Sequence, residues 1–182
     1  MPINITRRNI IADEEHASSL SKKEIKDIAE AYAEILYKPL EDDIKDVVTK
    51  KLNGSFTEFN PFINQDISGS LEVDMSNETF SITLSQFTSN VRDNFTIAHE
   101  LGHLFLHCNT FNDGELVHFK RFESNRLEWE ANWFAGSFLM PKNIFERVCV
   151  ENEYFIPSIA IRFGVSEQAV TIRMKELGIG GV

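Results

Sequence analysis

Three residues, His99, Glu100 and His103, have the types and the spacing of a metal site. Side chains four residues apart on an α-helix lie one turn above each other, so the two imidazoles can point at one cation. Zinc suits these ligands, because it accepts imidazole nitrogen at ~2.0–2.1 Å and in catalytic sites keeps three protein ligands plus a water molecule. A neighbouring carboxylate can take a proton from that water and pass it to a leaving amine. The motif therefore predicts a Zn²⁺ site with Glu100 as general base.

A third protein ligand must come from another element, and the helical pattern over residues 125–139 offers one. Glu130 shares a face with the apolar residues of this pattern and is expected to point into the core. A carboxylate in a core is costly unless it is paired or metal-bound, so Glu130 is the predicted third ligand. Glu128 is turned from that face by about 200° and is expected in solvent. Glu123 and Asp113 are further alternatives.

Four other side chains could take part in the chemistry of the motif, and three of them have a second interpretation. His107 extends the row of histidines, but three histidines along one helix span ~12 Å, which favours support of a ligand or a charge at the helix C-terminus over direct metal binding. Cys108 is either an inhibitory ligand at the open metal position or a small buried hydrophobe. Arg92 suits a substrate carbonyl or carboxylate, or an ordinary surface ion pair. His118 is a candidate for stabilising an oxyanion.

The elements that must position these residues follow from capping and periodicity. Ser21 and Glu24 have the spacing of a capping box, which predicts a helix that ends before Pro39. A weaker helical pattern runs from Ile44 to Leu52. Further helices are expected at residues 91–108, 125–139 and 142–150, and two short ones within 157–177.

From Ser55 to Gln86 the period changes to two, with alternation from Ile67 to Asp74 and again from Phe80 to Leu84 on either side of Ser76-Asn77. This predicts an antiparallel hairpin with one buried face, whose edge could pair with an extended substrate segment. The element order predicts an α+β fold of the zincin-like kind, in which a small antiparallel sheet packs on helices. The predicted domain covers residues 1–150, with 1–20 as a loose arm.

Residues 151–182 are expected to form a helical, helix-turn-helix-like segment. Its second helix begins after Ser166, and Gly164 lies in the turn. The basic Arg162, Arg173 and Lys175 face two acidic residues, so the net positive charge is small for a DNA reader. This composition favours a packing module or a protein-docking surface.

Composition narrows the class of protein. With 182 residues the chain suits one compact domain, and a formal net charge of −10 argues against a protein that mainly coats phosphates or an anionic membrane. Two cysteines are too few for a disulfide scaffold, and no signal-peptide or membrane-spanning run is visible. The expectation is a cytoplasmic protein with no membrane contact.

Beyond the five-residue motif, three segments resemble the ImmA/IrrE family of zinc metallopeptidases: Asn94 to His107, Glu128 to Ala135, and Leu139 to Pro141. The resemblance covers roughly residues 20–150. It implies that His99 and His103 are zinc ligands, that Glu100 is the general base, and that Glu130 matches the third ligand.

The family is bacterial and phage-borne, and its members are associated with cleaving helix-turn-helix repressors. The resemblance therefore implies an endopeptidase whose partner is such a repressor, and whose action releases stress, mobile-element or phage-defence genes. The alternative is a zinc-containing regulator that binds DNA or a partner protein without proteolysis.

Overall fold

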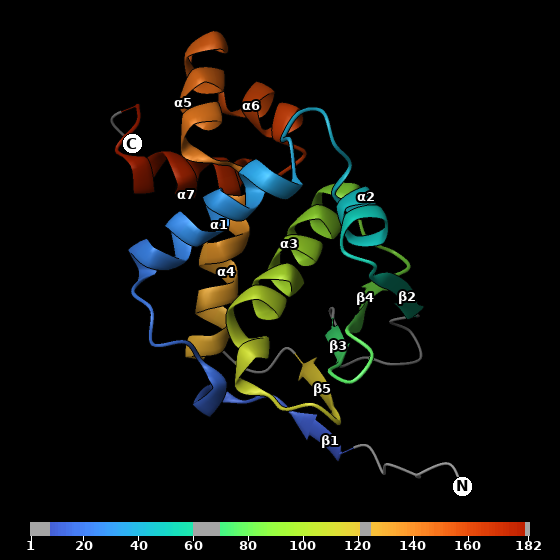
Figure 1. Cartoon of the computed structure of the whole chain (residues 1–182). Helices are drawn as coiled ribbons and strands as arrows, with labels where there is room; N and C mark the ends of the chain where they lie inside the picture. The colour runs from blue at the N-terminus through green and yellow to red at the C-terminus, as the bar shows by residue number, and fades with distance from the viewer. Residues whose placement is uncertain (1–7, 60–69, 121–124, 181–182) are drawn as a thin grey trace, which may run out of the picture.

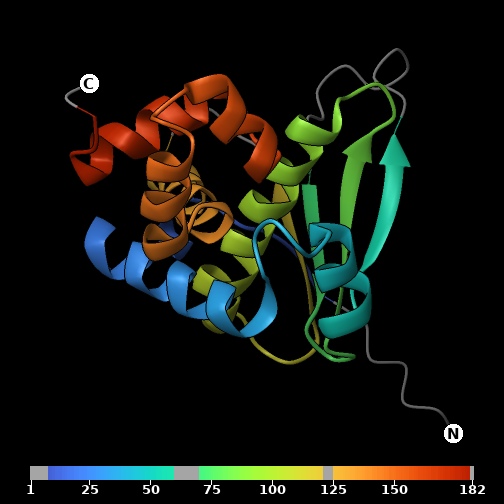
Figure 2. The ribbon, with the colours of Figure 1, turned by 90° about the horizontal axis from the view of Figure 1, so that it is seen from above.

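A long central helix, α3, runs between a β-sheet and most of the other helices (Figures 1 and 2). The computed structural model describes residues 8–59, 70–120 and 125–180. Its elements confirm the predicted α+β class. In chain order they are β1 (Arg8–Ile11), η1 (Glu14–His16), α1 (Lys22–Leu36), α2 (Ile44–Asp46), η2 (Val47–Lys51), β2 (Ser55–Phe59), β3 (Ser70–Asp74), β4 (Thr79–Ser85), α3 (Asn90–His107), η3 (Cys108–Thr110), β5 (Glu115–Lys120), α4 (Arg126–Leu139), α5 (Lys142–Glu151), α6 (Ile156–Phe163) and α7 (Glu167–Leu177).

The described sheet has the strand order β1-β5-β3-β4-β2. The hairpin of β3 and β4 is confirmed, with Leu71 opposite Ile82, although Ile67 and Gly69 lie outside the described residues. The sheet is mixed rather than antiparallel as expected, because β1 pairs in parallel with β5 and β2 in parallel with β4. Both edges of the hairpin are paired, β3 with β5 and β4 with β2, so the outer described strands are β1 and β2. An extended substrate therefore cannot pair with the hairpin's edge, as the sequence suggested it could.

The N-terminal residues differ from the expected loose arm. Arg8 to Ile11 form β1, which pairs with β5, and the backbone N–H of Ser18 donates to a carboxylate oxygen of Glu130 at 2.8 Å. A strand of four residues has too short a pattern to be seen locally. Its partner lies about a hundred residues further along the chain, so only the tertiary structure reveals it.

One face of the sheet packs on α3 and the opposite face is polar. Because side chains alternate along a strand, Val117 and Phe119 of β5 are buried while His118 lies on the other face, beside Glu72. The Phe119 ring stacks on the imidazole of His103, with centroids 5.0 Å apart. The face of α3 that carries His103 therefore packs against the sheet.

Local sequence explains where the helices begin. The predicted capping box is present at α1: the Ser21 hydroxyl accepts from the backbone N–H of Glu24, and the Glu24 carboxylate accepts from that of Ser21. At α3 and α4 only the cap side chain takes part: Ser89 accepts from the backbone N–H of Arg92, and Asn125 accepts from that of Glu128. These side chains satisfy backbone donors that a helix start leaves without partners.

A close approach of α3 and α4 depends on Gly102. A Cβ atom there would lie 3.0 Å from the Cα of Ala131 and 3.2 Å from its carbonyl oxygen. Such contacts are tighter than side chains usually make, so glycine allows the two helices to approach closely without a shift of either backbone. The close approach lies between the two histidines in the sequence of α3 and at the second turn of α4.

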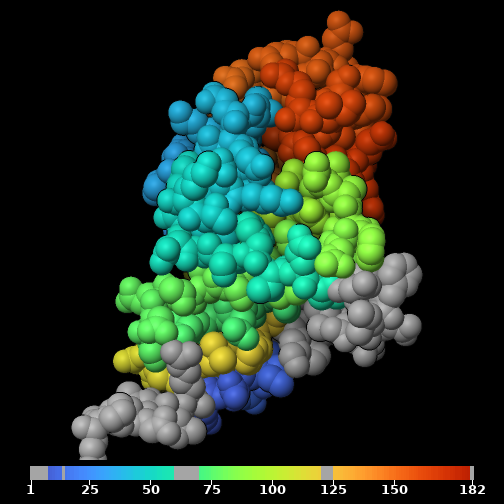
Figure 3. Space-filling model, turned by 90° about the vertical axis from the view of Figure 1, so that its right-hand side faces the viewer, coloured from blue at the N-terminus to red at the C-terminus, as the bar shows by residue number. Residues whose placement is uncertain are grey.

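Helices α5, α6 and α7 form the end of the molecule away from β1 and β5 (Figure 3). Gly164 ends α6 in the left-handed conformation, with φ of 61°, and Ser166 caps α7, as the sequence indicated. Arg173 of α7 is only 2% exposed. Its guanidinium donates to the carbonyl of Met140 and the hydroxyl of Ser137, each at 3.0 Å, and pairs with Glu30 of α1.

Replacing Arg173 by Met should therefore lower the free energy of unfolding by about 3 kcal/mol, because the buried oxygens of Ser137 and Met140 lose their donor and Glu30 loses its ion pair. Urea denaturation measures this. The matched control is Arg162→Met, which removes an exposed pair with Glu151 and should cost less than about 1 kcal/mol. Equal losses in the two variants would contradict the anchoring role of Arg173.

Among the described residues, none of the helices combines the length and the apolar character that crossing a bilayer requires.

Candidate metal centre

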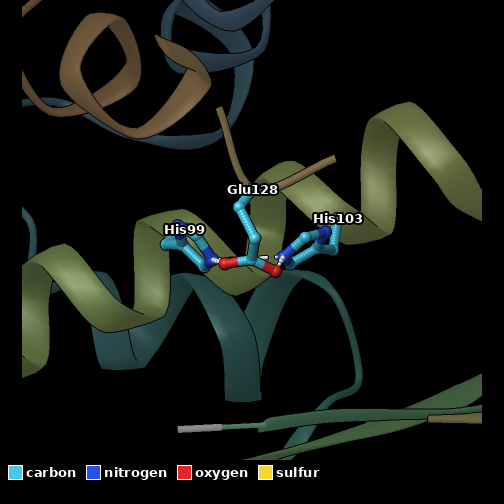
Figure 4. Close-up of side chains that lie close together, drawn as sticks. All are labelled: His99, His103 and Glu128. Carbon is cyan, nitrogen blue, oxygen red and sulfur yellow. Dashed lines mark hydrogen bonds and ion pairs between the residues drawn. The ribbon is translucent and has the colours of Figure 1, made fainter. Parts of the chain in front are cut away.

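The structure brings together the side chains of His99, His103 and Glu128 (Figure 4). The histidines come from successive turns of α3 and the glutamate from the first turn of α4. The two Nε2 atoms lie 3.1 Å apart, and the Glu128 carboxylate lies 3.2 Å from His99 Nε2 and 3.4 Å from His103 Nε2. Two imidazole nitrogens and the two oxygens of one carboxylate, from two helices, thus converge on one point.

These separations fit a tetrahedral metal ion. With bonds of about 2.0–2.1 Å, two ligand atoms of a tetrahedral zinc site are about 3.4 Å apart. The three measured separations lie close to that value. Two imidazoles and one carboxylate are also a donor set found in catalytic zinc sites, where the fourth position is kept for water or substrate. The residues present therefore fit Zn²⁺.

The protonation states of the group suit a cation. Burial lowers the pKa of His103 to about 3, since a buried imidazolium loses its hydration. Burial raises the pKa of Glu128, but its close contacts with the imidazoles of His103 and His99 outweigh this effect and bring the pKa down to about 2. At neutral pH His103 is thus neutral and Glu128 is ionised, which are the forms that bind a metal.

Glu100, the predicted general base, lies on α3 between the two histidines and is 1% exposed. It directly follows His99, so its side chain leaves the helix about 100° further round than that of His99.

The structure places Glu128, and not Glu130 as expected, beside the two histidines. Glu128, expected in solvent, is 7% exposed and lies against the imidazoles, so that expectation was wrong. Glu130 is fully buried as predicted, but it accepts from His107, the Ser18 backbone and Arg126 instead of joining the group. The physical reason is that α4 is covered on two faces, by α3 on one and by α1 and η1 on the other.

A sequence signal for Glu128 did exist. Glu128 and Asn132 are four residues apart and share one face of α4, and Asn132 Oδ1 lies 3.0 Å from His99 Nδ1. A carboxylate and an amide on the face that meets two histidines form a ligand and its support. The apolar stripe of α4 instead predicted that Glu130 is buried, and the side of α4 that carries Glu130 packs against α1 and η1.

Of the remaining candidates, those that the structure describes are not members of the three-residue group. Burial raises the pKa of the Cys108 thiol to about 12, so the thiolate needed for an inhibitory ligand is disfavoured at neutral pH. His118 lies on the face of the sheet away from α3, which separates it from His103. Arg92 is exposed in the first turn of α3, Asp113 lies in the turn before β5, and Glu123 is outside the described residues.

A buried His-Glu-x-x-His helix with a carboxylate from a neighbouring helix beside it is the arrangement typical of zinc-dependent hydrolases. The family model described as the IrrE N-terminal-like domain, a peptidase family, matches residues 56–175. This covers well over half of the chain, and the chain belongs to that family, as the sequence resemblance predicted. The family is a group of zinc-dependent peptidases, in agreement with the His-His-Glu group.

Two other comparisons concern individual proteins. Among curated proteins none matches the chain. Among solved structures the chain is similar to a Mycobacterium tuberculosis transcriptional regulator, with a TM-score of 0.57 and 16% sequence identity over 84% of this chain and 46% of that one. At this identity the likeness shows the fold alone. The chain spans less than half the length of that regulator.

Proposed function

We propose that the protein is a zinc-dependent endopeptidase that hydrolyses a peptide bond in a regulatory protein. The observation that supports this best is the convergence of His99, His103 and Glu128: the two Nε2 atoms lie 3.1 Å apart, and each lies 3.2 or 3.4 Å from one oxygen of the Glu128 carboxylate. Membership of a family of zinc-dependent peptidases supports it independently.

The chain's own residues divide the chemical work. His99, His103 and Glu128 would hold the ion, which when bound supplies Lewis acidity toward a carbonyl oxygen and a water molecule. Glu100 takes the proton that the water gives up as it attacks the peptide carbon, and then delivers that proton to the leaving amine nitrogen. The Phe119 ring stacked on His103 shields one side of that imidazole from water.

The substrate class that we propose is a helix-turn-helix repressor. It follows from the resemblance to ImmA/IrrE peptidases, whose members are associated with cleaving such proteins. Removing the repressor would release the genes under its control.

Nucleic acid is the less favoured ligand, for a structural reason. Two of the three basic residues counted in the C-terminal segment are already engaged, because Arg173 is buried against Glu30 and Arg162 pairs with Glu151 at 2.7 Å. A phosphate-binding face on α7 would need these charges to be available.

The test is an incubation of the purified full chain with the helix-turn-helix protein encoded beside it, in the presence of Zn²⁺ and in the presence of a chelator. Metal analysis should give one zinc per chain, and mass spectrometry should show two fragments only when zinc is present. An equimolar zinc protein that leaves the repressor intact and shifts DNA in a gel at two salt concentrations would favour the non-proteolytic regulator instead.

A further inference from the structure

A second histidine–glutamate pair, fully buried, lies behind the metal centre. His107 Nδ1 is 3.1 Å from His103 Nδ1, and His107 Nε2 is 3.1 Å from a carboxylate oxygen of Glu130. Both residues are 0% exposed. A continuous hydrogen-bonded chain therefore runs from Glu130 through His107 to the side of His103 that faces away from the cation site.

We propose that His107 and Glu130 are positioning residues, which fix the tautomer of His103 so that its Nε2 lone pair faces the metal ion. The inference deepens the proposed function, since it rests on a cation being held at His103.

The direction of the hydrogen bonds follows from the Glu130 end. Its carboxylate accepts from Arg126 Nε at 2.7 Å and from the backbone N–H of Ser18 at 2.8 Å, and an ionised carboxylate can only accept. His107 Nε2 must then donate to Glu130. A neutral imidazole carries one donor and one acceptor, so His107 Nδ1 is left to accept.

That acceptor determines the state of His103. The proton between the two Nδ1 atoms must sit on His103, which leaves Nε2 of His103 without a hydrogen. Nε2 is the atom that lies 3.1 Å from His99 Nε2 and 3.4 Å from Glu128. The chain of hydrogen bonds therefore selects the one neutral tautomer that can bind the metal from this side.

The other ligand has a separate support of the same kind. Asn132 Oδ1 accepts from His99 Nδ1 at 3.0 Å, which again leaves Nε2 free to bind. Supports of this kind typically change metal affinity by about 10–100-fold. The arm through His107 differs because it ends on Ser18, so the segment before α1 contributes to the order of the metal centre.

The experiment compares His107→Phe with His107→Asn in the full chain. Phenylalanine keeps much of the volume and removes the acceptor, whereas the side-chain oxygen of asparagine can take the place of Nδ1. Imidazole nitrogen NMR of the metal-free protein reports the tautomer of His103, and competition with a chelator gives the Zn²⁺ affinity. Asn132→Leu is the matched control on the other arm.

We expect His107→Phe to populate the Nε2–H tautomer of His103 and to weaken Zn²⁺ binding about 10–100-fold, with much of the affinity recovered in His107→Asn. Asn132→Leu should change the tautomer of His99 and leave that of His103 unaltered. If His107→Phe does not fold, Glu130→Gln tests the chain from its far end, because a neutral amide no longer obliges His107 Nε2 to donate.

A purely structural role predicts a different result. In that case the melting temperature of His107→Phe would fall, but His103 would keep its Nδ1–H tautomer and the Zn²⁺ affinity would stay within about 2-fold of that of the unaltered chain. This result would overturn the proposal. Failure of the proposed function is distinguishable, because the tautomer and the affinity would then respond as expected while no peptide was cut.

Discussion

Glu100→Gln is expected to bind zinc as the unaltered chain does and to cleave its protein substrate at least about 100-fold more slowly. The amide has nearly the same shape as the carboxylate, so the helix that carries His99 and His103 should be undisturbed. It cannot take a proton from water at neutral pH, and general acid–base catalysis is typically worth about 10²–10⁴-fold. Single-turnover cleavage with saturating zinc measures the loss.

The control for this variant is the metal itself. Zinc content by metal analysis should remain one ion per chain, which separates loss of the base from loss of the ion. A Glu100→Gln protein that cuts its target at the normal rate would show that another group accepts the proton.

Glu128→Gln is expected to weaken Zn²⁺ binding by more than about 100-fold, beyond the usual effect of a residue that only supports a ligand. The carboxylate lies within 3.4 Å of both Nε2 atoms, so the substitution removes the only negative charge among the three proposed protein ligands. Chelator competition gives the affinity. Cobalt substitution, followed by visible absorption, gives the geometry at the ion.

Glu130→Gln provides the matched comparison, since it makes the same chemical change two residues away on the same helix. It should cost less affinity than Glu128→Gln, because Glu130 reaches the centre only through His107. The opposite order would restore Glu130 as the third ligand, which is the assignment that the sequence favoured.

The contrast between these two glutamates shows what periodicity can and cannot establish. A single apolar stripe predicts which residues are buried, and it placed Glu130 correctly in the interior. It assumes that a helix has one covered face. Since α4 packs against α3 on one face and α1 on another, two glutamates about 200° apart are both buried, and the stripe does not tell which of them meets the histidines.

The sheet gives the same lesson at a larger scale. Alternation and a short turn predicted the β3–β4 hairpin because its two strands are neighbours in the sequence. The parallel pairings of β1 with β5 and of β2 with β4 join segments that are far apart, and nothing local marks them.

By itself, the sequence determined the features that depend on residues close together in the chain. These are the capped start of α1, the hairpin, and two histidines on successive turns of α3 with a glutamate between them in the sequence. Those features follow from hydrogen bonds and side-chain directions within a few residues. Only the tertiary structure decided which glutamate lies against the two imidazoles and which one hydrogen-bonds to His107. That choice depends on how closely α3 and α4 approach at Gly102, and a contact between helices is set by packing across the core rather than by the residues of either helix alone.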